Sequence, residues 1–512
     1  MRVEYSPHSD NQALTALIAA GALLSLLWYG VFLFDPRHFG HPLSYVLLLA
    51  AEIVGMIQVL GIWLSLLISP SHPPLPEVSS IRRDLADGKL KPSVAVFITV
   101  CGEDPAVVRK TAAAARDMHV AHRTVLLDDG DSAEVRAVAR EVGVEYITRP
   151  EKDGKKAGNI NYALTQVKTD FFSVIDCDHV PRPEFLLEML PYLLKDAKLA
   201  FVQTPQYFGN TNMFVSGGSA EMQEVFYRHI QPRKNLQNSA FCVGTNVTFR
   251  REALMELGGI YDGSNSEDIW TSLILHEKGW KSLFLPTVLA VGETPETVDS
   301  FFRQQTRWAK GGFEILLGRN PLANPKLTWG QRLQYFHTTF YYMSGFSVLF
   351  FYVLPLLYIY FGWKPLESGH TSAIWILHFL PYYVMTFFSN AYLLGRAPLW
   401  RSFVMTQTAF PAHLSAFFSA LTGKTIRWSV TGTIKRKSDY LTSVAPHLLL
   451  MLLTAGAIPV ILLQPGERPL ALIFFLWMTW NLCALFAVCK RAIPRYAHAI
   501  EEPTPVSYAP AS

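Results

Sequence analysis

Long apolar runs without charge lie at both ends of the chain and flank a middle segment with the mixed pattern of a globular domain. About 20 apolar residues are enough to cross the hydrocarbon core of a bilayer as a helix. Six runs approach or exceed this length: Ala13–Phe34, Leu43–Ser69, Phe336–Phe361, Thr371–Leu394, Thr442–Leu463 and Leu470–Cys489. The pattern predicts a membrane protein with two spans before the middle segment and four after it. The first run lacks the short core and cleavage site of a signal peptide, so it is expected to be retained.

The stretch Pro398–Leu421 differs from these runs because polar side chains, among them Arg401, Gln407 and His413, interrupt it. It is expected to be a helix lying in the membrane interface, with a seventh span as the alternative. The predicted organisation is residues 1–72 with two spans, 73–332 as a globular domain, 333–397 with two spans, 398–441 with the interfacial helix and a loop, 442–490 with two spans, and a tail at 491–512.

Basic residues near the span ends are concentrated on one side of this layout. They are Arg82, Arg83, Lys89, Lys91, Arg332, Lys424, Arg427, Lys435, Arg436, Lys437, Lys490, Arg491 and Arg495. The short loops on the opposite side hold only Arg37 and Lys364. Because Lys and Arg are enriched in cytoplasmic loops, the globular domain is predicted to be cytosolic in a multi-pass protein of the plasma or inner membrane, in contact with membrane lipid.

Short β-branched runs alternate with helical patterns in the middle segment. The predicted strands are Ser93–Val100, Thr124–Leu127, Val144–Thr148, Phe171–Ile175 and Leu199–Gln203, and the predicted helices are Glu103–Met118, Ser132–Val142, Lys156–Thr165 and Pro183–Leu193. Such alternation predicts an α/β domain with a largely parallel sheet covered on both faces. Ligands of these sheets bind at the carboxyl ends of the strands, where Asp128 and Asp176 stand.

Charge and cysteine content narrow the class of partner. The net charge of +4 is modest, and no basic tract with interleaved aromatic residues is present. Nucleic acid is therefore not an expected partner. None of the five cysteines forms a pair with zinc-site spacing, which agrees with a reducing cytosol around the middle segment.

Two acidic motifs follow predicted strands. Asp176 and Asp178, with His179 beside them, have the hard oxygen ligands that suit Mg²⁺ or Mn²⁺ and the phosphates such ions bind. Asp128 and Asp129 precede Gly130, which permits a tight turn near a nucleotide. A solvated turn is the alternative for each motif taken alone.

Three further motifs complete the set of candidate site residues. Lys156 begins a predicted helix and is a candidate phosphate or ribose contact, or else surface charge. Asp268 precedes another helix, either as its cap or as a general base. Gln304, Arg307 and Trp308 suit sugar stacking and phosphate binding, with a membrane-interface anchor as the alternative.

In this order, the motifs resemble the D,D,D,QxxRW pattern of the processive inverting glycosyltransferases of family 2, whose catalytic domain has the GT-A fold. Several strings are similar to the bacterial cellulose synthase catalytic subunits within that family. They are Lys156-Ala157-Gly158-Asn159, Asp176-Cys177-Asp178-His179, Val202-Gln203-Thr204-Pro205, His276-Glu277-Lys278-Gly279-Trp280 and the gating-loop string Trp428-Ser429-Val430-Thr431. The resemblance covers about residues 93–317 and extends into the spans.

The resemblance implies a role for each candidate residue. Thr99, Glu103, Asp128 and Asp129 would contact uridine, and Lys156 would lie beside the nucleotide. Asp176 and Asp178, with His179 adjacent, would bind the nucleotide and a Mg²⁺ or Mn²⁺ ion, and Asp268 would be the catalytic base. Gln304, Arg307 and Trp308 would form the acceptor and pyrophosphate site, and Thr431 would touch the nucleotide when the loop closes.

Some features depart from the family pattern. Cys242 lies one place earlier than the family's acceptor-site cysteine, and the gating aromatic is Trp428 instead of Phe. Two predicted N-terminal spans are fewer than the bacterial cellulose enzymes have. A PilZ domain is not expected, because only a short tail follows Arg495.

The leading hypothesis is a synthase that uses a UDP-sugar and a growing polysaccharide acceptor, makes β-1,4-glucan from UDP-glucose and passes the chain across the membrane. An accessory secretion subunit is a further partner of such a system. The alternatives are a synthase of another β-glycan (chitin, hyaluronan, poly-N-acetylglucosamine or β-1,3-glucan), a non-processive glycolipid glycosyltransferase, and a transporter with a non-catalytic cytosolic domain, for which Glu52 inside an apolar run is the best feature.

Overall fold

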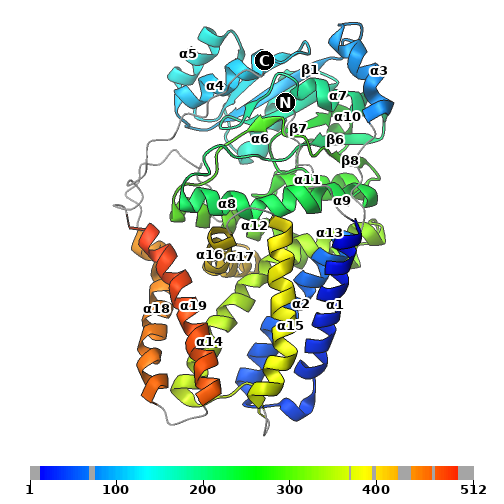
Figure 1. The fold of residues 1–512 in the computed structure, drawn as a ribbon. Helices are drawn as coiled ribbons and strands as arrows, with labels where there is room; N and C mark the ends of the chain where they lie inside the picture. The colour runs from blue at the N-terminus through cyan, green and yellow to red at the C-terminus, as the bar shows by residue number, and fades with distance from the viewer. Residues whose placement is uncertain are drawn as a thin grey trace, which may run out of the picture.

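The computed structural model describes residues 12–67, 75–367, 371–394, 399–424, 440–463 and 468–493. An α/β domain stands on a bundle of long helices, with shorter helices between the two parts (Figure 1). This arrangement confirms the predicted fold class of a helical transmembrane bundle joined to an α/β domain.

A mixed seven-stranded sheet forms the centre of the α/β domain, in the order β3-β2-β1-β4-β7-β6-β8. The strands are β1 Val94–Val100, β2 Arg123–Asp128, β3 Glu145–Ile147, β4 Phe171–Asp176, β6 Leu199–Gln203, β7 Val247–Arg250 and β8 Lys281–Phe284, and β5 Val180–Pro181 pairs separately with β9 Ala290–Val291. All five predicted strands are present. Strand β7 runs antiparallel to both β4 and β6, and neither it nor β8 was predicted.

Helices cover both faces of the sheet, as the alternation predicted. They are α3 Leu75–Ala86, α4 Pro105–Arg116, α5 Ala133–Val142, α6 Lys155–Gln166, α7 Phe185–Lys195, α10 Arg251–Met255 and α11 Glu267–Glu277. Three further helices, α8 Phe214–Val225, α9 Gln231–Lys234 and α12 Val298–Gly318, lie between the sheet and the long helices (Figure 1). Because side chains of a strand point alternately to its two faces, Val96 and Ile98 pack with α4, α5 and α7, while Ala95 and Phe97 pack with α6. The core therefore has two layers, one on each side of the sheet.

The long helices form the bundle in Figure 1. They are α1 Gln12–Leu33, α2 Pro42–Leu67, α13 Trp329–Phe340, α14 Ser344–Phe361, α15 Thr371–Leu394, α18 Tyr440–Leu463 and α19 Arg468–Arg491. Within the described residues, five segments are long and apolar enough to cross a membrane: Ala13–Leu33, Pro42–Leu67, Trp329–Phe361, Ser443–Ile461 and Ile473–Arg491. Their surfaces carry exposed leucines and aromatic residues, as lipid-facing helices do.

The fourth predicted span, Thr371–Leu394, forms helix α15 with the predicted bounds. It is not among the five apolar segments found in the described chain. It nevertheless packs along α1. Its crossing of the membrane therefore stays a prediction.

The stretch predicted to be one interfacial helix contains two helices, α16 Leu399–Thr408 and α17 Phe410–Thr422. The break falls at Ala409, next to Pro411 at the start of α17, where proline is tolerated in a first turn. Helix α16 packs on α8, and α17 packs on α12. Figure 1 shows both helices between the α/β domain and the long helices. They connect the two parts of the molecule.

Candidate active site

The carboxyl ends of β1, β2 and β4 bring the predicted residues of the nucleotide side together. Thr99 lies opposite Asp176 in the sheet register, and Val100 lies opposite Asp128. The Thr99 hydroxyl donates a hydrogen bond of 3.0 Å to Asp176 Oδ1. Three neighbouring strands therefore end in one place, as parallel topology requires.

Lys156 approaches the same carboxylate from helix α6. Its ammonium donates to Asp176 Oδ1 and also to the Gly244 carbonyl at 2.8 Å. Burial opposes ionisation of Asp176, but the charge of Lys156 outweighs it and holds the pKa of Asp176 below its ordinary value. The carboxylate is therefore ionised and held in a fixed position at neutral pH.

Asp176, Asp178 and His179 form a group whose ligand atoms all lie within 4.8 Å of one another. His179 Nδ1 bonds to Asp178 Oδ1 at 2.8 Å. Its Nε2 is buried and has no partner among the described residues. Two half-exposed carboxylates next to an imidazole suit a divalent cation such as Mg²⁺ or Mn²⁺. The donor set thus fits the metal expected from the sequence.

The two aspartates after β2 have different surroundings. Asp128 is fully buried. Its Oδ1 accepts from Gly130 N at 2.8 Å, and its Oδ2 accepts from Ser132 N at 2.8 Å and Tyr146 Oη at 2.9 Å. Asp129 bonds instead to the guanidinium of Arg149, at 2.7 Å and 2.8 Å.

Glu103 lies in the turn after β1, where its Oε2 accepts from the backbone N–H of Cys101 at 2.6 Å. Burial, together with the carboxylates of Asp178 and Asp176, raises the pKa of Glu103. Burial first, and then the charges of Glu103 and Asp129, raises the pKa of Cys101 to about 11. Glu103 therefore lies close to Asp129 and to the metal-binding group, and their negative charges act on the same turn.

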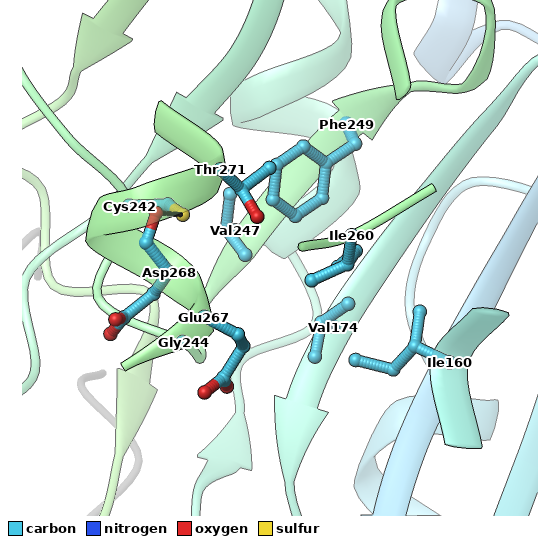
Figure 2. Close-up of a pocket in the computed structure, with 10 residues that line it drawn as sticks. All are labelled: Ile160, Val174, Cys242, Gly244, Val247, Phe249, Ile260, Glu267, Asp268 and Thr271. Atoms are coloured by element: carbon cyan, nitrogen blue, oxygen red, sulfur yellow. Dashed lines mark hydrogen bonds between the residues drawn. The ribbon is translucent and has the colours of Figure 1, made fainter. Parts of the chain in front are cut away.

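Asp268 stands in the first turn of α11. Burial, and secondly the charge of Glu267, raises the pKa of Asp268 to about 7. A Cβ at Gly244 would lie 3.3 Å from Asp268 Oδ2 and 3.8 Å from Lys156 Nζ, so both side chains adjoin this glycine. Figure 2 shows the carboxylates of Glu267 and Asp268 turned away from Phe249 and Thr271.

Cys242 packs behind Asp268 (Figure 2). It is buried, and its Sγ contacts the Asp268 carbonyl oxygen at 3.1 Å. The hydroxyl of Ser272 donates to the same carbonyl at 2.9 Å. In this structure Cys242 therefore supports the first turn of α11.

Helix α12 places Gln304, Arg307 and Trp308 against the start of α11. Ser266 Oγ donates to the Arg307 carbonyl at 3.2 Å, and Ser266 also packs so closely on Gly311 that any side chain there would collide with it. The charge of Arg307 lowers the pKa of Asp268, although less than burial and Glu267 raise it. Over the described ranges, the Arg307 guanidinium makes no hydrogen bond or ion pair, and Gln304 Oε1 is buried without a partner.

Comparison with known proteins agrees with this geometry. Residues 92–311 match the family described as "Glycosyltransferase like family 2". These residues form a family 2 glycosyltransferase domain. The chain is 35% identical to a cellulose synthase catalytic subunit (UDP-forming) of Pseudomonas fluorescens over 60% of its own length and 42% of that protein. It is 32% identical to cellulose synthase 1 of Komagataeibacter xylinus over 53% of its own length and 18% of that protein.

The chain therefore spans less than half of the length of these curated relatives. Among solved structures, a mannosyltransferase from Pyrobaculum calidifontis in complex with GDP-Man and Mn²⁺ superposes with a TM-score of 0.52 at 14% identity, covering 75% of this chain and 100% of that one. At this identity the likeness shows the GT-A fold of the glycosyltransferase domain.

Some residues of the glycosyltransferase site were not predicted from the sequence, and one predicted residue lies outside the part of the chain that the structure describes. Arg149, Tyr146 and Thr245, whose hydroxyl oxygen accepts a hydrogen bond of 2.9 Å from the backbone N–H of Asp176, were not predicted. Arg149 follows β3, so the rule that sites lie at carboxyl ends of strands would have found it. Thr431 lies outside the described residues. The assigned roles of the other site residues stay predictions.

Proposed function

We propose that this chain is a processive inverting glycosyltransferase that polymerises a β-linked glycan from a UDP-sugar, with β-1,4-glucan from UDP-glucose as the leading product. The observation that carries the proposal is the convergence at Gly244 of Asp268, which has a pKa of about 7, and Lys156, which holds Asp176. A base beside a metal-binding acidic group is the arrangement that transfer from a nucleotide sugar needs.

In the proposed reaction, the terminal hydroxyl of the acceptor attacks the anomeric carbon of the sugar. The new glycosidic bond forms as the bond to the diphosphate breaks, so the configuration inverts and UDP leaves. Asp268 accepts the hydroxyl proton, for which a pKa near the operating pH is favourable. Arg307, whose guanidinium has no partner among described residues, would bind the negative charge of the diphosphate.

Asp176, Asp178 and His179 would hold the divalent cation. When bound, Mg²⁺ or Mn²⁺ neutralises phosphate charge and makes the diphosphate a better leaving group. Lys156 and Thr99 keep the Asp176 carboxylate oriented for this task. The mannosyltransferase of the same fold was solved with Mn²⁺, which supports this assignment.

The membrane part suggests where the product goes. Helix α12, which carries Trp308, packs on α17, and α17 packs on α14. The acceptor would therefore enter the bundle next to Trp308, from a catalytic domain on the cytosolic side of a plasma or inner membrane. An accessory secretion subunit would receive the chain on the other side.

The test is incorporation of radiolabelled sugar by purified protein in detergent or vesicles. UDP-glucose should give a polymer that a β-1,4-glucanase degrades and a β-1,3-glucanase does not. UDP-N-acetylglucosamine incorporation would instead assign another β-glycan. A short glycolipid product would support a non-processive enzyme, and transport without UDP release would contradict the proposal altogether.

A further inference from the structure

Arg149 is a buried arginine that contacts two separate parts of the nucleotide side. Its side chain is 5% exposed, and that of Asp129 is 12% exposed. Nε and Nη2 form a bidentate pair with Asp129, at 2.7 Å and 2.8 Å. Nη1 donates to the Asp153 carbonyl, and Nη2 donates to the Lys155 carbonyl at 2.8 Å. One guanidinium therefore joins the end of β2 to the turn that begins α6.

The turn at residues 153–155 is shaped around this guanidinium. Gly154 and Lys155 have left-handed φ angles of 71° and 52°. A Cβ at Gly158 would lie 2.5 Å from Arg149 Nη1 and 2.1 Å from the Asp153 carbonyl oxygen, so only glycine leaves room there. The next residue after the turn is Lys156, which reaches Asp176. The position of Lys156 thus depends on the position of Arg149.

The neighbouring carboxylate, Asp128, has less hydrogen-bond acceptor capacity left for a ligand than Asp129 has. It accepts three hydrogen bonds from its own loop and from Tyr146, and it has no exposed surface. Asp129 accepts only from Arg149 among the described residues and retains some exposure. A carboxylate oxygen can accept a second hydrogen bond, so Asp129 keeps acceptor capacity for a ligand.

We propose that Arg149 is a positioning residue that orients the Asp129 carboxylate toward the nucleobase and, through the 153–155 turn, sets Lys156 beside Asp176. This inference rests on the proposed function. A carboxylate at that place accepts a hydrogen bond from the N3–H of uracil, whereas cytosine has no hydrogen on N3. Arg149 therefore contributes to both the affinity and the base selectivity of the nucleotide site.

The matched pair of variants is Arg149→Lys and Arg123→Lys. Arg123 also forms a bidentate pair between neighbouring strands, with Glu145 at 2.8 Å and 2.7 Å, but both partners are about half exposed and lie at the far end of β2. Lysine retains the charge and loses the two-pronged geometry. Kinetics with UDP-glucose, and binding of UDP and CDP in the presence of Mg²⁺, would be measured for both variants.

We expect Arg149→Lys to raise KM for UDP-glucose and the Kd for UDP about tenfold or more, as loss of an orienting partner does, and to reduce the preference for UDP over CDP. Arg123→Lys should leave these quantities unchanged. The proposal is overturned if Arg149→Lys lowers only kcat or the yield of folded protein while KM and the UDP preference match those of Arg123→Lys.

A second variant keeps the test decisive if Arg149→Lys folds poorly. Asp129→Asn should also raise the Kd for UDP, and the double variant should be no worse than Arg149→Lys alone, because Arg149→Lys has already disrupted the contact with Asp129. Additive losses would contradict the coupling. Wild-type protein that binds UDP but forms no polymer would defeat the proposed function and leave this binding comparison intact.

Discussion

The residues predicted to bind the nucleotide (the nucleotide side) and those predicted to bind the acceptor (the acceptor side) differ in how their charged groups are paired. On the nucleotide side, Asp129 pairs with Arg149 and Asp176 pairs with Lys156. On the acceptor side, Asp268 has no ion-pair partner in the part of the chain that is described, and neither has Arg307. The charge of Lys156 holds the pKa of Asp176 below its ordinary value, whereas burial raises the pKa of the unpaired Asp268 to about 7. The difference indicates that one side is preorganised to bind and the other is kept ready to accept a proton.

Substitution of the unpaired carboxylate tests this contrast most strongly. Asp268→Asn removes the proton acceptor without changing the size of the side chain, so kcat should fall on the order of a thousandfold. Binding of UDP should change little, because Asp268 is not among the residues predicted to bind the nucleotide. The measurement is polymer formation alongside UDP affinity, with Asp117→Asn, an exposed aspartate paired with Arg116, as control. Retained turnover would remove Asp268 from its role.

Removal of the metal tests the nucleotide side. Chelation with EDTA should lower transfer by on the order of several hundredfold, since a bound cation supplies several kcal/mol of charge stabilisation. Addition of Mg²⁺ or Mn²⁺ should restore it in the wild type. Asp178→Asn should require a higher concentration of the ion, because one of its three candidate ligands is lost. Full activity in EDTA would show that the acidic group has another purpose.

Substitution of Arg307, whose guanidinium has no partner among the described residues, should lower activity less than Asp268→Asn or removal of the metal does. Arg307→Gln should lower kcat by about a hundredfold, as loss of one preorganised charge donor does. Because the charge of Arg307 lowers the pKa of Asp268, the variant should also need a higher pH for half-maximal kcat/KM. Arg303→Gln, an exposed position on the same helix paired with Asp299, is the control. An unchanged pH profile would indicate that Arg307 does not act on Asp268.

The strands of the sheet could be predicted from the sequence more completely than the side-chain contacts around them. Strands such as Val94–Val100 were found because their apolar residues form a continuous, β-branched run. Strand β7 was missed because four residues carry too little periodicity, and its antiparallel pairing depends on β4 and β6. Predicted site residues that follow strands were brought together because parallel strands end at the same edge.

Pairing of charges could not be predicted in the same way. The partners Asp129 and Arg149 are twenty residues apart, and only the end of β3 brings them together. Likewise, the third hydrogen bond accepted by the Asp128 carboxylate comes from Tyr146 on the neighbouring strand. Such features arise from tertiary contacts that no local pattern records.

The smallest expected effect is that of substituting Glu267, the residue next to Asp268. Burial and then the charge of Glu267 raise the pKa of Asp268. Glu267→Gln removes that negative charge, so the pKa of Asp268 should fall. The base is active when deprotonated, so kcat/KM is lost as the pH falls through about 7 in the wild type and at a lower pH in the variant. The ratio of activity at pH 6 to that at pH 8 should therefore rise about threefold, while Glu141→Gln, an exposed glutamate paired with Arg109, should leave the ratio unchanged. Loss of activity at every pH would mean that Glu267, and not Asp268, is the base, because glutamine cannot accept the proton. The contrast between the two sides would then have to be redrawn around Glu267.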